Sequence, residues 1–310
     1  IGTIAALALV QKKYKVLVVD KKNQILRDNR TLAVNANSTD FLKKLGIWKW
    51  LKSKPEPINK IVIKDNINIK PLIFENKYES MGNVIFNKEM YEVSKKKLEN
   101  LKILKTDTNI ESSSISPNKR LRINKSNYIF KKVIISIGKN VITNTNHQSI
   151  TFDKKQYSYV GFFKHFIDHK STAYEFFTEN GPLAILPVPT VNKKKSTFIY
   201  TSKEKINNFQ LQKIITKKIS KTHGKLDFDR SISKFPIMPH LIKNHDNFIY
   251  IGDSLKSIHP VAGQGWNLGI KDIQTLCKLL DQHSIDSKEL NSLYYSRRII
   301  ESTIYLGFTN

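Results

Sequence analysis

A stretch of acidic, polar and glycine residues at 252–272 has the composition of a ligand site. Gly252-Asp253 directly follows the short apolar run 248–251, which predicts a buried strand. In open α/β sheets, ligands bind beyond the carboxyl ends of the strands. Gly263 and Gly265 then precede a segment of helical apolar periodicity, where glycine lets backbone N–H groups approach an anionic or carbonyl-rich ligand. The pattern predicts a binding site; the alternative is a glycine-rich loop that only turns the chain.

The first twenty residues predict a second part of the same site. Residues 3–13 have helical apolar spacing, and residues 14–19 have the composition of a strand that ends at Asp20. An acid at this place commonly binds a ribose of an adenine dinucleotide, although a simple turn residue is the other interpretation. Gly2 corresponds to the third glycine of the Gly-x-Gly-x-x-Gly turn. The strand and the two glycines that precede it in that motif are missing, so we expect truncation here.

The composition limits the class of protein. The 310 residues carry a formal net charge of +26, but only 7 of the 52 basic residues are Arg. Proteins that read nucleic acids use Arg forks and clustered patches, whereas the Lys residues here are dispersed, so we expect no nucleic-acid partner. No apolar run approaches the ~20 residues that span a bilayer. Cys277 is the single cysteine, which excludes an intramolecular disulfide, and its helical apolar context predicts a packing role.

The predicted elements alternate between helix and strand near both ends and are mainly strands in the middle. Helices are expected at 38–51, with Ser38 as N-cap, at 88–100 and at 208–220. Strands are expected at 58–64, 102–107, 120–124, 127–135, 157–166, 172–177, 183–187 and 196–200. We therefore predict an α/β fold, α+β overall, in which a mainly antiparallel sheet domain is inserted into a Rossmann-like domain.

Several short motifs, distributed over almost the whole chain, match the landmarks of one family. They are 28–33 (Asp-Asn-Arg-Thr-Leu-Ala), 45–48 (Leu-Gly-Ile-Trp) with Pro57-Ile58, 173–178 with 181–187, the glycine stretch from 252 onward, and Tyr294 with Arg297. In this order they resemble the flavin-dependent aromatic hydroxylases of the para-hydroxybenzoate hydroxylase fold, and most of all the ubiquinone-biosynthesis hydroxylases. The resemblance implies an FAD-binding domain made of 1–60, 84–145 and 246–310, and a substrate-binding sheet domain made of 61–83 and 146–245. It also implies truncation at both ends.

The resemblance assigns roles to individual residues. Asp253 would bind the flavin ribityl chain, Asp20 the adenosine ribose, and Arg30 the flavin or its pyrophosphate. The remaining cofactor-binding positions that it implies are Gly2, Gly252, Pro260, Ala262, Gly263, Gln264, Gly265 and Asn267. No catalytic side chain and no metal are assigned, because the cofactor carries the chemistry. His259 is expected to pack beside Pro260 and is not expected to act as a base.

The activity implied is that of an FAD-dependent monooxygenase. NAD(P)H would reduce FAD, and a flavin C4a-hydroperoxide would hydroxylate a polyprenylated phenol or benzoquinol in ubiquinone biosynthesis. The implied partners are this lipophilic substrate and other quinone-biosynthesis enzymes, with a cytoplasmic location and peripheral contact at the inner face of the membrane. The alternative is a catalytically impaired homologue that acts as a scaffold in a quinone-biosynthesis complex.

Three features depart from the family pattern, and the first of them motivates that alternative. Ile137 in Ser136-Ile137-Gly138 replaces the aspartate of the family's Ala-Asp-Gly triplet. The segment 254–256 has a bulky residue and Lys256 where the family has Ala-Ala-His. Trp266 replaces a smaller apolar residue beside the glycine loop.

Overall fold

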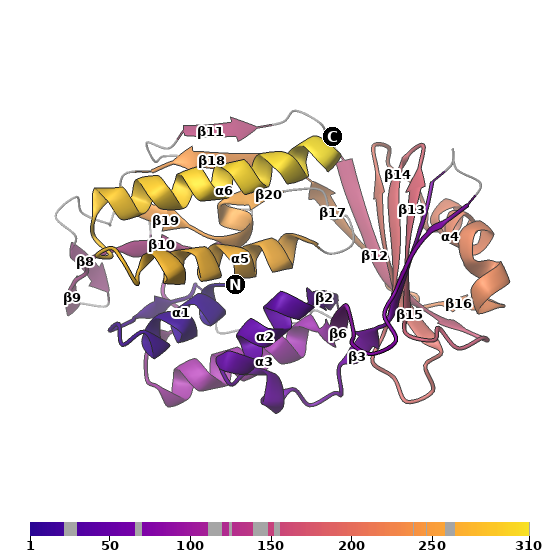
Figure 1. The fold of residues 1–310 in the computed structure, drawn as a ribbon, viewed down its shortest axis with the longest axis horizontal. Helices are drawn as coiled ribbons and strands as arrows, with labels where there is room; N and C mark the ends of the chain where they lie inside the picture. The colour runs from indigo at the N-terminus through magenta and orange to yellow at the C-terminus, as the bar shows by residue number, and fades with distance from the viewer. Residues whose placement is uncertain are drawn as a thin grey trace.

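The computed structural model describes residues 1–21, 30–65, 70–110, 120–123, 126–138, 148–151, 156–237, 239–245, 247–257 and 264–309. Two parts lie side by side (Figure 1). One contains most of the helices with short strands between them, and the other is a large sheet with a single helix on its outer face. This mixed architecture confirms the predicted fold class.

The first part is built on two pairs of short parallel strands. They are β1 (Val18–Val19) with β7 (Leu104–Lys105), and β10 (Val133–Ile135) with β19 (Phe248–Tyr250). Among the described strands, the two pairs are not joined into one sheet. Helices α1 (Gly2–Gln11), α3 (Asn87–Asn100) and α5 (Gln264–Leu279) pack around them and share one hydrophobic core.

Helix α2 (Ala36–Lys44) begins earlier and ends earlier than the sequence indicated. Its N-cap is Asn35, whose side chain accepts a hydrogen bond from the Ser38 backbone N–H at 2.8 Å. The predicted N-cap at Ser38 is therefore wrong. The N-cap is Asn35, three residues earlier, and its side chain binds the otherwise free N–H of Ser38 in the first turn of the helix. The chain then leaves the α-helix at Leu45 and forms a separate 3-10 turn at Trp48–Trp50.

The long helix α6 (Lys288–Thr309) lies along strand β19. Tyr295 Oη donates to Phe248 O at 2.9 Å and accepts from the Tyr250 N–H at 3.2 Å, while Tyr294 Oη donates to Tyr250 O at 2.8 Å. Both tyrosines are buried. They satisfy the backbone groups of β19 on the edge that faces away from β10.

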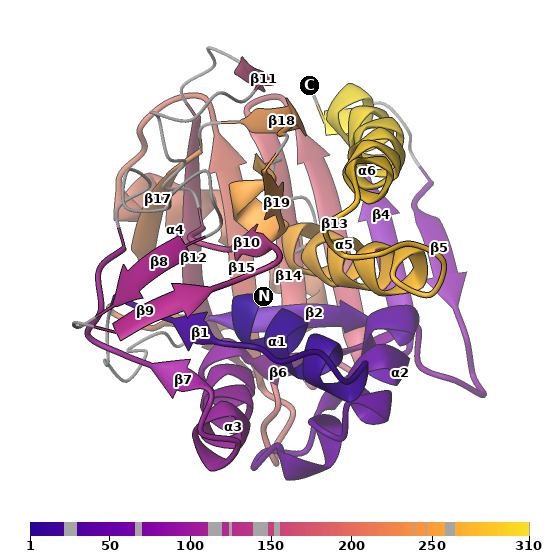
Figure 2. The ribbon, with the colours of Figure 1, turned by 90° about the vertical axis from the view of Figure 1, so that its left-hand side faces the viewer.

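The second part is an eight-stranded sheet, seen face-on behind the helices in Figure 2. Its order is β16-β12-β15-β14-β13-β4-β5, with β17 also paired to β12. Its strands are β4 (Lys60–Lys64), β5 (Leu72–Glu75), β12 (Gln156–His165), β13 (Thr172–Thr178), β14 (Gly181–Pro187), β15 (Lys195–Ser202), β16 (Leu226–Phe228) and β17 (Ser233–Ile237). All pairs in it are antiparallel except β4 with β13, which confirms a mainly antiparallel sheet.

The two faces of this sheet pack against different partners. Helix α4 (Asn208–His223) covers the outer face, where its buried Leu211, Ile215 and Ile219 join the aromatic core of the sheet. The inner face packs through Ala173 and Leu186 against a small sheet made of β2 (Thr31–Asn35), β6 (Gly82–Phe86) and β3 (Glu56–Ile58). The inner face is therefore the one directed toward the first part.

The remaining strands form two small groups. A hairpin consists of β8 (Arg120–Ile123) and β9 (Ser126–Ile129), so the predicted continuous strand at 127–135 is in fact two strands, β9 and β10. Strand β18 (His240–Asn244) pairs with β11 (Gln148–Thr151) and β20 (Lys256–Ser257). The boundaries assigned to the two domains stay a prediction.

Candidate functional site

Strands β10 and β19 end side by side at the start of helix α1. A Cβ added to Gly2 would lie 3.1 Å from Ser136 Cβ, so glycine lets α1 pack closely on the end of β10 without displacing Ser136. Gly252, just after β19, has φ +61°, a conformation that favours glycine. The Ser254 hydroxyl accepts from the Ile137 N–H at 2.7 Å and donates to Gly138 O at 3.1 Å, which ties the two strand ends together.

Asp253 extends from this junction toward the first turn of α5. The residue is exposed, and its Oδ1 lies 4.0 Å from the position that a Cβ on Gly265 would take. Helix α1 begins at the same place, with no side chain capping its first turn. An exposed carboxylate suits a polyol, and uncapped N–H groups suit an anionic phosphate, so these residues fit a flavin dinucleotide.

Asn267 joins helix α5 to strand β2. Its side-chain amide donates to Ala33 O at 2.7 Å, and its Oδ1 accepts from the Asn35 N–H at 3.1 Å. The residue is buried, and both its amide nitrogen and its amide oxygen bond the backbone of the β2 segment. Asn267 therefore positions the glycine-rich helix against the strand that approaches the large sheet.

Two further predicted residues lie at other places around this centre. Asp20 follows β1, where its backbone N–H donates to Lys105 O at 2.9 Å, and it is only partly exposed. Arg30 precedes β2 and is exposed, with its guanidinium 4.9 Å from the ring centroid of Phe235 in the large sheet. The structure thus brings Gly2, Gly252, Asp253 and Gly265 together, and the cofactor contacts of Asp20 and Arg30 stay predictions.

Some predicted positions lie outside the described residues. These are Pro260, Ala262 and Gly263, together with His259; the side chain of Gln264, the first residue of α5, is also not described.

A buried ionic cluster beneath the Gly252 turn was not expected from the sequence. Asp272 of α5 accepts hydrogen bonds from Lys256 Nζ at 2.5 Å, Arg298 Nε at 2.7 Å and the Gly252 N–H at 2.8 Å. Glu301 receives a further bond from Arg298 Nη1 at 2.5 Å. The cluster holds the backbone of the turn that carries Asp253.

The charges in this cluster compensate each other in a dry environment. The side chains of Lys256, Asp272 and Arg298 are at most 2% exposed. Burial lowers the pKa of the Lys256 ammonium, and the Asp272 carboxylate opposes that shift. Burial also acts to lower the pKa of Arg298, but Asp272 and Glu301 outweigh it and raise that pKa.

The sequence carries one local signal for this cluster. Asp272 lies four residues after Leu268 and four before Leu276, on the buried stripe of the helix, where an unpaired carboxylate would be very costly. Lys256 was taken as a departure from the family pattern, yet it supplies a partner to Asp272. Arg297, the residue of the motif shared with Tyr294, is exposed, whereas the neighbouring Arg298 is buried.

The other two departures have modest structural effects. The Ile137 side chain is 44% exposed, and only its backbone N–H takes part in the junction. Trp266 is partly buried and packs against the core around α5.

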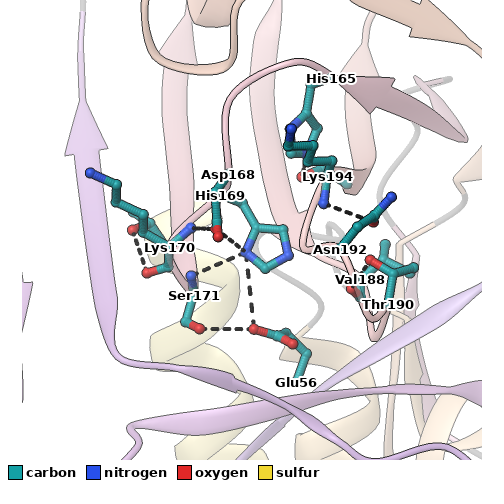
Figure 3. Close-up of polar contacts among 12 residues, drawn as sticks. Glu56, His165, Asp168, His169, Lys170, Ser171, Val188, Thr190, Asn192 and Lys194 are labelled. Atoms are coloured by element: carbon teal, nitrogen blue, oxygen red, sulfur yellow. Dashed lines mark hydrogen bonds and ion pairs between the residues drawn. The ribbon is translucent and has the colours of Figure 1, made fainter.

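A second buried polar cluster lies where the small sheet meets the large one (Figure 3). Ser171 Oγ donates to Glu56 Oε1 at 2.8 Å, and the Ser171 N–H donates to His169 Nδ1 at 3.1 Å. Burial lowers the pKa of His169 to about 4, so its ring is neutral. Because the serine hydroxyl bonds the glutamate and not the imidazole, this cluster lacks the Ser–His contact of a hydrolase triad and serves to join the two sheets.

No cluster of three or more His, Cys, Asp or Glu residues in the described part of the chain could hold a metal ion. No helix in that part is long and apolar enough to cross a membrane. Cys277 packs against the core of the first part, and burial raises the pKa of its thiol to about 11.

Comparisons with known proteins agree with this geometry. A family model described as "FAD binding domain" matches residues 139–297, slightly more than half of the chain. Ubiquinone hydroxylase UbiM of Neisseria meningitidis is 25% identical over 82% of this chain and 59% of its own length. The ubiquinone biosynthesis monooxygenase COQ6 of Caenorhabditis elegans is 24% identical over 87% of this chain and 72% of its own length.

Solved structures share the fold over almost the entire chain. The p-nitrophenol 4-monooxygenase PnpA of Pseudomonas putida superposes with a TM-score of 0.73 at 13% identity, covering 99% of this chain and 83% of that protein. The chain spans about 59% of the length of the Neisseria relative. With the family model matched over more than half of its residues, the chain belongs to the FAD binding domain family, that of the FAD-dependent aromatic hydroxylases.

Proposed function

We propose that this chain is part of an FAD-dependent monooxygenase that hydroxylates a polyprenylated phenol or benzoquinol in ubiquinone biosynthesis, with NAD(P)H and O2. The observation that carries the proposal is the junction at which the uncapped start of α1, the Gly252 turn and Asp253 meet the first turn of α5. The names of the Neisseria and Caenorhabditis relatives support the substrate class.

The residues of the junction divide the work of holding FAD. Asp253 accepts hydrogen bonds from the ribityl hydroxyls, and the start of α1 binds the pyrophosphate with its free N–H groups. Asp20 binds the adenosine ribose, and Arg30 adds positive charge near the flavin. The family resemblance assigns the pyrimidine edge of the ring to the segment from Ala262 to Gly265, whose backbone N–H groups would bind it. When bound, FAD supplies the redox and oxygen chemistry.

The inner face of the large sheet suits a lipophilic ring. Ala173, Leu186 and Ile199 lie on this face and pack toward β2, which Asn267 fixes to the flavin-side helix. Apolar side chains there exclude water from the reacting groups, which favours productive transfer of oxygen to an electron-rich phenol. Peripheral contact with the inner face of the membrane would give the enzyme access to such a substrate.

The test uses the complete protein. We expect it to purify with a flavin absorbance spectrum, to retain less flavin when Asp253 is changed to Asn than when the exposed Asp281 is, and to consume NAD(P)H and O2 when given a prenylated phenol. Complementation of strains that each lack one quinone hydroxylase, scored by the intermediate that accumulates, would identify the ring position. Complete, folded protein without bound flavin would refute the proposal.

The scaffold alternative makes a different prediction at residue 137. A Ile137→Asp variant of a scaffold would still show no turnover, whereas measurable turnover in the unmodified complete protein would exclude the scaffold. The relatives named as hydroxylase and monooxygenase support the enzyme.

A further inference from the structure

Glu175 is a buried carboxyl without a hydrogen-bond partner. It lies in the middle of β13, between Ile63 of β4 and Ala184 of β14, and is 5% exposed. Neither Oε1 nor Oε2 makes a hydrogen bond within the part of the chain that the structure describes. Leaving such a group unsatisfied is costly, so a buried carboxyl of this kind calls for a missing partner.

A hydroxyl on the same face of the sheet is in the same condition. Ala184 pairs with Ile199, and Thr201 lies two residues further along β15, so its side chain points to the same face. Thr201 Oγ1 is buried and makes no hydrogen bond to any described residue. The two unsatisfied polar groups therefore lie on the same face of the sheet, with strand β14 between the strands that carry them.

This face is the one that meets the flavin side of the molecule. Ala33 of β2 packs with Ala173, two residues before Glu175 on the same strand, and its carbonyl is bonded by Asn267 of α5. The row that contains Glu175 therefore lies beside the strand fixed to the glycine-rich helix.

The other end of the β2 segment approaches the same face. Ile199 pairs with Val160, which pairs with Ser233, so Phe235 lies on this face two residues further along β17. The Arg30 guanidinium lies 4.9 Å from the ring centroid of Phe235. Residues 30–33 thus contact the inner face on both sides of the row of Glu175.

The surroundings of Glu175 determine which form of the carboxyl is present. The side chains next to it in this row are those of Ile63, Ala184 and Ile199, none of which titrates. Arg30, which precedes β2 and lies at Phe235, is the charged group of that segment that faces this side of the sheet. Burial raises the pKa of Glu175 to about 8, with no charged neighbour contributing. A group of this kind exchanges its proton near neutral pH.

We infer that Glu175 is the binding site for the ring hydroxyl of a phenolic substrate, which donates a hydrogen bond to the Glu175 carboxyl. This rests on the proposed function and adds to it a polar contact that orients the ring on the inner face. A phenol hydroxyl that donates to a carboxylate makes a short, charge-assisted bond. The same bond increases electron density on the ring, which favours its hydroxylation.

The experiment measures binding to the complete, flavin-loaded protein, without turnover. The probes are 2-prenylphenol and its O-methyl ether, which has no hydroxyl to donate, and the readout is the change in flavin absorbance on titration. We expect the unmodified protein to bind the phenol at least 10-fold more tightly than the ether, and Glu175→Leu to bind both equally. Glu179→Gln, at an exposed position in the same hairpin, is the matched control and should behave as the unmodified protein.

The pH profile separates a direct contact from a structural role. Because the phenol stabilises the carboxylate, its affinity should rise as pH increases through the Glu175 transition near 8. Glu175→Gln keeps the shape but cannot ionise, so its affinity should not change with pH. The bound flavin content and melting temperature of each variant establish that it is folded.

The outcomes distinguish this inference from the proposed function. If the unmodified protein hydroxylates the phenol while Glu175→Gln and Glu175→Leu keep the full preference over the ether, the Glu175 site is refuted and the proposed function stands. A flat pH profile in the unmodified protein also refutes the site. Flavin-loaded protein that binds neither probe and turns over no phenol refutes both.

Discussion

Asp272 is the anion that contacts both buried cations beneath the Gly252 turn, so its removal gives the sharpest test of the fold. Asp272→Asn preserves the size and one acceptor oxygen but removes the negative charge that faces Lys256 and Arg298. Glu301 still bonds Arg298, so the cation left without an anion is Lys256, whose side chain is 2% exposed.

The expected cost follows from the burial of this pair. Removing one partner of a buried ion pair costs about 3–5 kcal/mol, whereas exposed pairs contribute about 0–1 kcal/mol. Asp281 provides the matched control, since its carboxylate pairs with Lys12 and is 64% exposed. Urea unfolding of the complete protein should therefore show a loss of about 3–5 kcal/mol for Asp272→Asn and less than about 1 kcal/mol for Asp281→Asn.

A second substitution tests the cause of that loss. Changing Lys256 to Met in the Asp272→Asn background removes the uncompensated cation and should restore a large part of the stability. Because Asp272 also accepts the Gly252 N–H, the single variant should retain less flavin. Equal losses for the two aspartate variants, or no recovery in the double variant, would refute this account of the cluster.

Three further predictions concern single positions. Gly252→Ala forces a side chain into φ +61° with Ile1 atoms 3.3 Å away, so unfolding in urea should show a loss of at least about 1–2 kcal/mol; an unchanged midpoint would contradict this. Glu175 has a folded pKa of about 8, above its unfolded value, so its contribution to the free energy of unfolding is present at low pH and is lost as pH rises from about 4.5 through 8. In Glu175→Gln, the decrease in the free energy of unfolding over this pH range should be smaller by up to about 4–5 kcal/mol. Parallel curves of unfolding free energy against pH for the two proteins would contradict this. Burial lowers the pKa of His223 to about 4, below its unfolded value, so stability is lost as pH falls from about 6.5 to 4; melting temperatures of His223→Phe should fall less steeply over that range, and an equal fall would exclude this histidine as a cause.

The parts of the site that the sequence predicted are those written in local patterns. A buried strand followed by Gly252 and Asp253, and then by a glycine-rich helix start, has the same meaning in any open α/β fold. The structure places these residues and Gly2 together, because the ends of the parallel strands and the starts of the helices lie at the same edge of this fold. The antiparallel sheet was likewise readable from short runs rich in β-forming residues.

The parts that could not be predicted depend on pairing between distant segments. Glu56 and Ser171 are 115 residues apart in the chain, and only the register between two sheets brings their oxygens within 2.8 Å. The pairing of Lys256 with Asp272 could not be predicted, because it forms only when the strand and the helix pack together. The lack of a hydrogen-bond partner for Glu175 likewise could not be predicted, since it depends on which side chains of the neighbouring strands lie next to it in the folded sheet.

The pair of tyrosines on α6 has a consequence for aggregation. Strand β19 has β10 as its strand neighbour, and its opposite edge would otherwise present N–H and C=O groups able to recruit a strand from another molecule. The hydroxyls of Tyr294 and Tyr295 bond the backbone groups on that edge. Helix α6 therefore satisfies these groups in place of a further strand. Local unfolding of α6, or cleavage in the turn before it, would remove these bonds and expose the unpaired backbone N–H and C=O groups of β19. We expect self-association of the protein to begin at this exposed strand edge.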